Sequence, residues 1–302
     1  MISTGNDYRK YLEPEVISKL KTLDLKARFI VEGFMVGLHK SPYHGFSAEF
    51  SEHRPYMQGD SIKNIDWKVF AKRDKYFIKQ FEEETNLISH IFLDVSKSMN
   101  YKSSGSVTKL EYAITLAAAL LYIIINQQDA AGLVVYSDVI QNYLPPKSNK
   151  IYMKKLFTEL ANVKPSGATN TSECLKSVLD KIKKRGLVII ISDFFDDPES
   201  VISAIKKFHY KKNEVIVFQI VDPAEKDFSF DRDAVFKDLE TGEEMTTLPY
   251  QIQKSYIEAF NEFTNKIKKE CRSFGVEYNL ISTADPFDKA LFSYFTKRMR
   301  LN

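Results

Sequence analysis

Short runs of apolar, mostly β-branched residues recur between stretches of helical periodicity from Leu87 onward, and this alternation constrains the fold most strongly. Runs such as GLVIIISDFF and NEVIVFQIVD are apolar at nearly every position. A strand of that composition has both of its faces buried, and its alternation with helices is typical of a parallel sheet covered by helices on each side. We therefore predict an α/β fold for residues 87–302, with a doubly wound, mostly parallel sheet flanked by helices.

The first 86 residues follow a different pattern. A leading helix is expected from Glu13 to about Leu38, and a β-rich stretch follows it. Residues 75–80 alternate with period two, and residues 58–61 read as a turn. We therefore predict a small N-terminal helix plus β subdomain over residues 1–86. In the larger domain, residues 241–247 are expected to form a loop or a hairpin before a long amphipathic helix.

Composition excludes several classes of protein. The 302 residues are 44% hydrophobic, and Lys plus Arg number 43 against 40 for Asp plus Glu, so the net charge of +3 gives no reason to expect nucleic acid or anionic lipid as the main partner. The two cysteines, Cys174 and Cys271, lack the spacing of a disulfide framework or a zinc site. The N-terminus has no secretory pattern, and the apolar stretch 112–125 is shorter than a membrane-spanning helix. We predict a cytoplasmic protein without membrane insertion.

Side chains that could carry chemistry follow the apolar runs. In an open α/β sheet ligands bind beyond the carboxyl ends of the strands, so polar residues at those points are candidates for a site. One set follows the first apolar run, one lies in the hydroxyl-rich loop 167–172, and one ends the run that begins at Leu187. The candidates are Asp94, Ser96, Ser98, Thr169 and Asp193.

These five residues offer hard oxygen donors with no histidine or thiol among them. Such a set suits Mg²⁺ better than Zn²⁺, with Mn²⁺ as the alternative cofactor. Five protein groups, some acting through water, leave an octahedral ion at least one position for a carboxylate from another molecule. Because several of the donors are neutral hydroxyls, the charge of the ion is incompletely compensated, and an acidic side chain of a partner would be attracted to it.

The order of these residues resembles a known site. Asp94-x-Ser96-x-Ser98, then Thr169, then the strand end at Asp193 are similar to the metal-ion-dependent adhesion site of von Willebrand factor type A domains. The upstream region resembles the bacterial family called domain of unknown function 58. The residues that carry this second resemblance are Gly45, Glu49, the stretch 54–60, Ile65, Asp66, Trp67 and Ala71.

The two resemblances imply a fold and a role. They imply a von Willebrand factor type A-like domain that binds a protein partner through a divalent ion. Members of the second family are commonly associated with MoxR-type AAA+ ATPases, which makes such an ATPase the expected partner. Ala168 departs from the type A pattern, which often has a second glycine there; this change leaves the Thr169 hydroxyl in place.

Simpler interpretations stand beside the metal site. Ser96 and Ser98 could be turn and capping residues ahead of the helix that begins near Lys109. Asp196 and Asp197 precede a proline and are expected at a helix N-terminus, where carboxylates are favourable. Cys174 is expected to be a small buried side chain.

Three functions are compatible with the sequence. The first is a non-enzymatic, metal-dependent protein-binding module, an adaptor or regulator that works with a MoxR-type AAA+ ATPase. The donor set favours this function because no base accompanies it. The second is a magnesium- or manganese-dependent hydrolase, which needs a general base that only Asp196 or Asp197 could provide. The third is a scaffold in which the N-terminal subdomain docks the partner. Residues for that docking are Arg54, Asp60, Asp66 and Trp67, whose structural alternative is a charge pair, a turn and an aromatic core anchor.

Overall fold

The computed structural model of the protein describes most of the chain from Leu12 onward. The described residues are 12–40, 54–55, 77–78, 87–103, 105, 107–228, 230, 234–237, 239 and 244–299. They belong to two compact units, of which the larger comprises Met1–Gly37 with Asn86–Asn302 and the smaller comprises Leu38–Thr85. The candidate metal-binding residues all lie in the larger unit.

A six-stranded sheet forms the centre of the larger unit. Its strand order is β10-β7-β6-β3-β4-β5, and all neighbours are parallel except β4 and β5. The parallel strands are buried runs of β-branched residues, as the sequence pattern requires. The predicted α/β fold class, with a mostly parallel sheet, is confirmed. The strands are β3 (Ile88–Asp94), β4 (Ala130–Tyr136), β5 (Ile140–Lys147), β6 (Leu187–Ser192), β7 (Glu214–Val221) and β10 (Glu277–Ser282).

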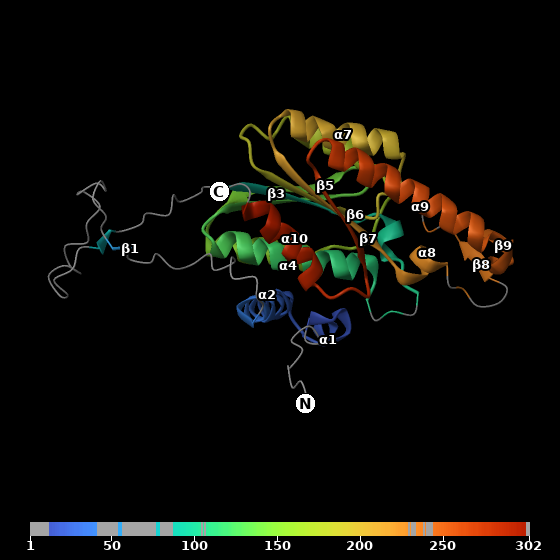
Figure 1. The fold of residues 1–302 in the computed structure, drawn as a ribbon, viewed down its shortest axis with the longest axis horizontal. Coiled ribbons are helices and arrows are strands. Elements are labelled where there is room, and N and C mark those ends of the chain that lie inside the picture. Colours follow the sequence, from blue (N-terminus) through green and yellow to red (C-terminus); the bar gives the residue numbers. More distant parts are fainter. Residues whose placement is uncertain are drawn as a thin grey trace. The chain divides into compact units, whose positions relative to one another are not determined.

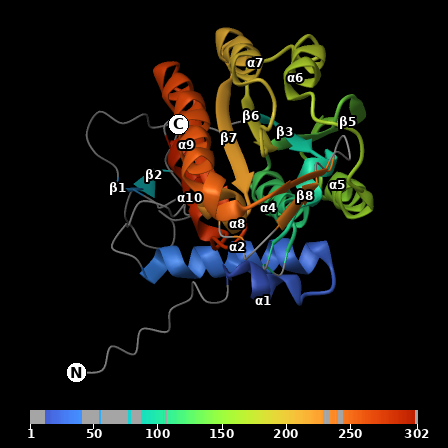
Figure 2. The ribbon, with the colours of Figure 1, turned by 90° about the vertical axis from the view of Figure 1, so that its right-hand side faces the viewer.

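Helices cover both faces of this sheet (Figures 1 and 2). On one face, α4 and α10 lie side by side and α5 packs against α4. On the other face, α6, α7 and α9 enclose a continuous apolar core with the strands. The helices are α4 (Lys109–Asn126), α5 (Lys150–Asn162), α6 (Thr171–Leu179), α7 (Pro198–Tyr210), α9 (Pro249–Ser273) and α10 (Asp288–Met299), with the short helices η3 (Lys97–Asn100) and α8 (Pro223–Asp227) after strands β3 and β7.

Polar residues define where the helices of the site begin. The Thr108 hydroxyl accepts from the backbone N–H of Glu111, whose carboxylate accepts from the backbone N–H of Thr108, so α4 starts with a complete capping box. Asn170 caps α6 through its side chain. Asp197 caps α7, with Pro198 at the first helical position. These caps fix the points at which the loops that follow η3, α5 and β6 end.

Strand β5 was not predicted from the sequence. It is the antiparallel edge strand of the sheet and contains Pro145 and Pro146. Proline lacks a backbone N–H, so strands that contain it are confined largely to sheet edges. The two prolines interrupt the sequence pattern of a strand, which is why β5 was missed. They are tolerated because β5 lies at the edge of the sheet.

The leading helix differs from the prediction. We expected one helix from Glu13 to about Leu38, whereas the structure has α1 (Pro14–Ser18) and α2 (Leu23–Lys40) with a break between them. These helices lie against the layer of α4 and α10 (Figures 1 and 2). The rings of Phe34 and Phe295 stack with centroids 5.4 Å apart.

The grouping of the N-terminal residues also differs from the predicted subdomain over residues 1–86, although the smaller unit ends at Thr85, close to the predicted boundary. Residues up to Gly37 group with the sheet, because α2 buries its apolar side chains on the same body. The smaller unit contains a pairing of β1 (Arg54–Pro55) with β2 (Phe77–Ile78). The expected turn at 58–61 lies outside the described residues.

Residues 241–247 were expected to form a loop or a hairpin. In the structure, β8 (Ala234–Lys237) pairs antiparallel with β9 (Glu244–Thr247) just before α9. The hairpin prediction is therefore confirmed.

Within the described residues, one helix is long and apolar enough to cross a membrane. This is α4, and 78% of its apolar window is buried inside the protein. Its side chains pack against β3, β4 and β7, so the helix acts here as a core element of the α/β domain. The cytoplasmic location stays a prediction.

Replacement of Phe34 by alanine should test the packing of α2 on the domain. Phe34 is 3% exposed and stacks on Phe295, so Phe34→Ala should lower the free energy of unfolding by about 3–5 kcal/mol. Urea denaturation would measure the change. Leu25→Ala on the same helix is the control, because Leu25 is 50% exposed, and its effect should stay below about 1 kcal/mol. Equal losses of unfolding free energy in the two variants would contradict the packing of Phe34 against the domain.

Candidate metal-binding site

The predicted site lies where the strand order reverses. The chain runs from β3 to β4 on one side and then crosses to β6 on the other side of β3. Loops at such a switch point diverge to opposite faces of the sheet and leave room for a ligand beyond the strand ends. Asp94 ends β3, and Ser192 and Asp193 end the neighbouring strand β6. The sheet topology therefore brings two carboxylates together at the most favourable place for a ligand.

Asp94 is held by hydrogen bonds on both carboxylate oxygens. Its Oδ1 accepts from the backbone N–H of Ser96 at 2.9 Å, and its Oδ2 accepts from the hydroxyl of Ser192 at 2.6 Å. The side chain has no exposed surface. Because each bond comes from a different strand end, the orientation of the carboxylate is fixed in the absence of any ligand.

Three hydroxyls form a chain beside Asp94. The Ser96 and Ser98 Oγ atoms are 2.9 Å apart, and Ser98 Oγ lies 3.3 Å from Thr169 Oγ1. Ser98 and Thr169 are separated by 71 residues in sequence. The backbone N–H of Lys97 donates to the carbonyl of Gly167 at 3.2 Å, which joins the two loops. The sequence predicted this grouping of hydroxyls, and the structure brings them within hydrogen-bonding distance.

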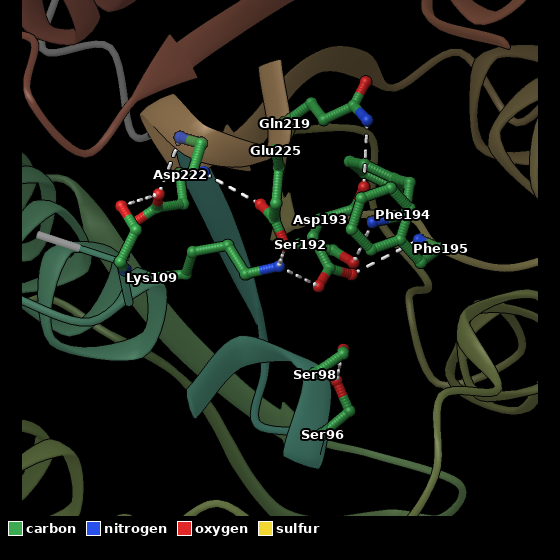
Figure 3. A network of polar contacts seen from close by, with 12 residues as sticks. Ser96, Ser98, Lys109, Ser192, Asp193, Phe194, Phe195, Gln219, Asp222 and Glu225 are labelled. Atoms are coloured by element: carbon green, nitrogen blue, oxygen red, sulfur yellow. Dashed lines mark hydrogen bonds and ion pairs between the residues drawn. The ribbon is translucent and has the colours of Figure 1, made fainter. Parts of the chain in front are cut away.

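Asp193 points toward the pair of serines and also contacts a lysine (Figure 3). Its Oδ2 lies 2.9 Å from Lys109 Nζ, and its Oδ1 accepts from the backbone N–H of Phe195 at 3.2 Å. Lys109 Nζ also contacts Glu225 Oε1 at 2.6 Å. Both side chains of the Lys109 and Asp193 ion pair are completely buried.

Lys109 and Glu225 were not predicted as parts of the site. The sequence pattern predicts only a helix start near Lys109, and Glu225 lies on α8 after β7. One signal was available for Lys109: it is the first residue of a strongly apolar helix and follows the serine loop closely. No local pattern relates Glu225 to Asp193, because the connection exists only across neighbouring strand ends.

The network extends to the end of β7 (Figure 3). Glu225 accepts from the backbone N–H of Asp222 at 2.8 Å. Asp222 is buried and accepts from the backbone N–H and the hydroxyl of Ser103. The loop that carries Ser96 and Ser98 is therefore attached at its far end to β7.

Burial and a neighbouring carboxylate shift the proton equilibrium of Asp94. Removal from water and the charge of Asp193 raise the pKa of Asp94 to about 7, although the hydrogen bonds from Ser192 and Ser96 oppose the rise. A raised pKa means that negative charge on Asp94 is poorly compensated by the protein. A cation placed between the two carboxylates would relieve this cost.

The donor set fits a hard divalent cation. Among the described residues, no three His, Cys, Asp or Glu side chains gather into a metal-binding group. The candidate site therefore depends on hydroxyls as well as carboxylates, and such donors suit Mg²⁺ or Mn²⁺. The residues that could hold the ion are Asp94, Ser96, Ser98, Thr169 and Asp193.

The capping alternative for the serines does not account for their contacts. Helix α4 is capped by Thr108, and Ser96 makes no side-chain capping bond to η3. The hydroxyls of Ser96 and Ser98 instead face each other and Thr169. The three hydroxyls therefore form a contiguous row of oxygen donors beside Asp94.

The other carboxylates near the site have structural contacts. Asp197 accepts from the backbone N–H of Ser200 and caps α7, as predicted. Asp196 accepts from the backbone N–H groups of Asp197 and Ser172. Cys174 is buried, and burial raises the pKa of its thiol to about 12, so it is not poised as a nucleophile.

The predicted docking residues of the N-terminal subdomain are largely outside the described residues. Arg54 lies in β1, and Asp60, Asp66 and Trp67 lie outside the described residues. Their role as a partner-binding surface stays a prediction.

Gly167 should tolerate an added side chain less well than a glycine of the same conformation that has open space around it. Its φ is +72°, and an added Cβ would lie 2.3 Å from Asp138 Oδ1 and 2.7 Å from Ser137 Oγ. Gly275→Ala is the matched control, because Gly275 has the same φ but no atom within 4 Å of the added Cβ. Gly275→Ala should lower the free energy of unfolding by about 1 kcal/mol, and Gly167→Ala should lower it by at least about 1 kcal/mol more. Urea denaturation would measure both values. Equal losses of unfolding free energy in the two variants would contradict this prediction, because they would show that the loop around Gly167 accommodates the added Cβ.

The stability of the metal-free protein should depend on pH through Asp94. The pKa of an Asp in an unfolded chain is about 3.9, whereas the pKa of Asp94 in the folded protein is raised to about 7. Between these values the folded state binds more protons, so this group makes stability fall as pH rises from about 4 to 7. Urea denaturation in EDTA should show a smaller fall for Asp94→Asn. An identical pH dependence for both proteins would contradict the uncompensated burial of Asp94.

Comparison with known proteins places the chain in a family. The model of the protein of unknown function DUF58 matches residues 52–266. An uncharacterized protein of Mycobacterium tuberculosis is 23% identical over 239 residues, which cover 76% of this chain and 73% of that protein.

Solved structures are also similar to this chain. The conserved hypothetical protein BatB of Bacteroides thetaiotaomicron has a TM-score of 0.48 and 18% identity, covering 72% of this chain and all of that one. The SpRpn10 VWA domain has a TM-score of 0.41 and 14% identity, covering 68% of this chain and 94% of that one. The family model covers well over half of the sequence, and the chain therefore belongs to the family of proteins of unknown function DUF58.

Proposed function

We propose that this protein is a non-enzymatic binding module that recruits a protein partner through a divalent cation. The observation that carries the proposal is the assembly of Asp94 with the hydroxyls of Ser96, Ser98 and Thr169 at the switch point of the sheet. These donors are assembled by hydrogen bonds within the protein. A ligand would therefore meet a site that needs little reorganisation.

The roles of the residues follow from their charges and contacts. The hydroxyls of Ser96, Ser98 and Thr169 would hold the ion directly, and the carboxylates of Asp94 and Asp193 would provide most of its charge compensation. When bound, Mg²⁺ or Mn²⁺ would supply a positive centre that attracts an oxygen ligand. Because three of the five protein donors are neutral, that centre favours an acidic side chain from the partner.

The leading candidate for the partner is a MoxR-type AAA+ ATPase. This expectation comes from the family resemblance of residues 45–71 and not from the geometry of the site. The geometry adds only the chemical requirement that the partner present an exposed Asp or Glu to the ion.

The hydrolase alternative receives less support from the contacts. It requires a carboxylate placed to activate water, yet Asp197 caps a helix and Asp196 accepts two backbone N–H groups. Lys109 is engaged by two carboxylates. Among the described residues around the strand ends, these contacts leave the hydrolase without a general base of its own.

Binding of a purified MoxR-type ATPase from the same organism tests the proposal. In Mg²⁺, Asp94→Asn should weaken binding at least about tenfold, because a major charge of the site is lost. Asp197→Asn is the matched control: it makes the same chemical change at an exposed carboxylate, keeps a good helix cap, and should bind like wild type. Biolayer interferometry would measure the affinities.

The alternatives predict different results in this experiment. Unchanged binding by Asp94→Asn, with loss of binding by Arg54→Ala, would move the function to the N-terminal subdomain. Turnover of generic phosphoesters in Mn²⁺ that disappears in Asp193→Ala would instead support the hydrolase.

A further inference from the structure

Lys109 is a charged side chain in an unusual position. It is completely buried, and its Nζ contacts Asp193 at 2.9 Å and Glu225 at 2.6 Å. The Nζ also lies 4.8 Å from the centre of the Phe195 ring, whose face favours a cation. The side chain is thus enclosed on all these sides by groups that stabilise a positive charge.

The helix itself does not favour a lysine at this point. Lys109 is the first residue of α4, where the positive end of the helix dipole disfavours positive charge. Burial of an ammonium group adds a large desolvation cost. The two carboxylates that Lys109 contacts are therefore the groups that offset both costs.

The contacts place this positive charge beside the candidate metal site. Asp193 belongs to the set that could hold the ion, and one of its oxygens faces Lys109. Phe195 N–H occupies the other oxygen. A divalent cation and the Lys109 ammonium would therefore share the negative charge of the same carboxylate.

We propose that Lys109 acts as a resident cation that compensates Asp193 and Glu225 in the metal-free protein and lowers the affinity of the site for divalent cations. Lys109 is a positioning residue for Asp193 and is not itself a ligand. Its effect is to keep the metal-free site folded and to make metal binding reversible. This inference rests on the metal site of the proposed function.

Charge variants give a test with a distinctive pattern. Lys109→Met removes one positive charge and keeps the volume close to that of lysine, Glu225→Gln removes one negative charge, and the double variant leaves the net charge of the site unchanged. Isothermal titration calorimetry with Mn²⁺ would measure the affinity of each protein. Thermal unfolding in EDTA would measure the stability of its metal-free form.

Electrostatics predicts opposite effects for the two single replacements. Lys109→Met should bind Mn²⁺ roughly tenfold more tightly or better, and Glu225→Gln roughly tenfold more weakly, since a charge within about 10 Å acts strongly on a divalent ion. The double variant should return close to wild-type affinity. In EDTA, Lys109→Met should melt roughly 10 °C below wild type, and Mn²⁺ should restore most of the loss.

The outcomes separate this inference from the metal site on which it rests. If wild type binds Mn²⁺ and both single variants bind it more weakly, Lys109 only supports the fold and the inference is overturned. If wild type shows neither heat of binding nor stabilisation by Mn²⁺, the metal site itself is overturned. If Lys109→Met does not fold even with Mn²⁺, the weaker binding of Glu225→Gln and its recovery in the double variant still decide the inference.

Discussion

Two carboxylates at adjacent strand ends, both removed from water, impose the central constraint on this protein. Asp94 and Asp193 repel each other, and burial increases the cost of charging Asp94. The surrounding contacts stabilise the two carboxylates. Ser192 and a backbone N–H hold Asp94, and Lys109 holds Asp193. The polar network therefore exists because the sheet places like charges together, and its composition determines what the site can bind.

The same contacts connect the site to the scaffold. Lys109 begins α4, Glu225 lies on α8, and Asp222 joins the end of β7 to Ser103 in the serine loop. Most of these elements are packed on a sheet whose faces are both covered, so they have little freedom to move independently. A ligand that changes the balance of charge at Asp193 would act on α4 and α8 through direct contacts.

The N-terminal helices belong to this body by packing, although their sequence suggested a separate unit. Phe34 stacks on Phe295, and the carbonyl of Leu12 accepts from the backbone N–H of Phe287. Residues from the beginning of the chain thus cover the C-terminal helix. The smaller unit begins only after α2 has made these contacts.

The sequence by itself determined the α/β class, because runs that are apolar at nearly every position are stable as strands when both of their faces are buried. It also indicated Asp94, Ser96, Ser98 and Asp193 as candidate ligands, since polar residues that follow such runs lie at the carboxyl edge of the sheet. Thr169 was indicated by its hydroxyl-rich loop ahead of a predicted helix. It did not reveal β5, where Pro145 and Pro146 disguise an edge strand, or the break before α2. Only the tertiary structure decided that Lys109 pairs with Asp193, 84 residues away, and with Glu225. Local periodicity shows which face of a helix or strand is buried. A buried ion pair between distant residues depends instead on which strand ends lie next to each other, and that is set by the sheet topology.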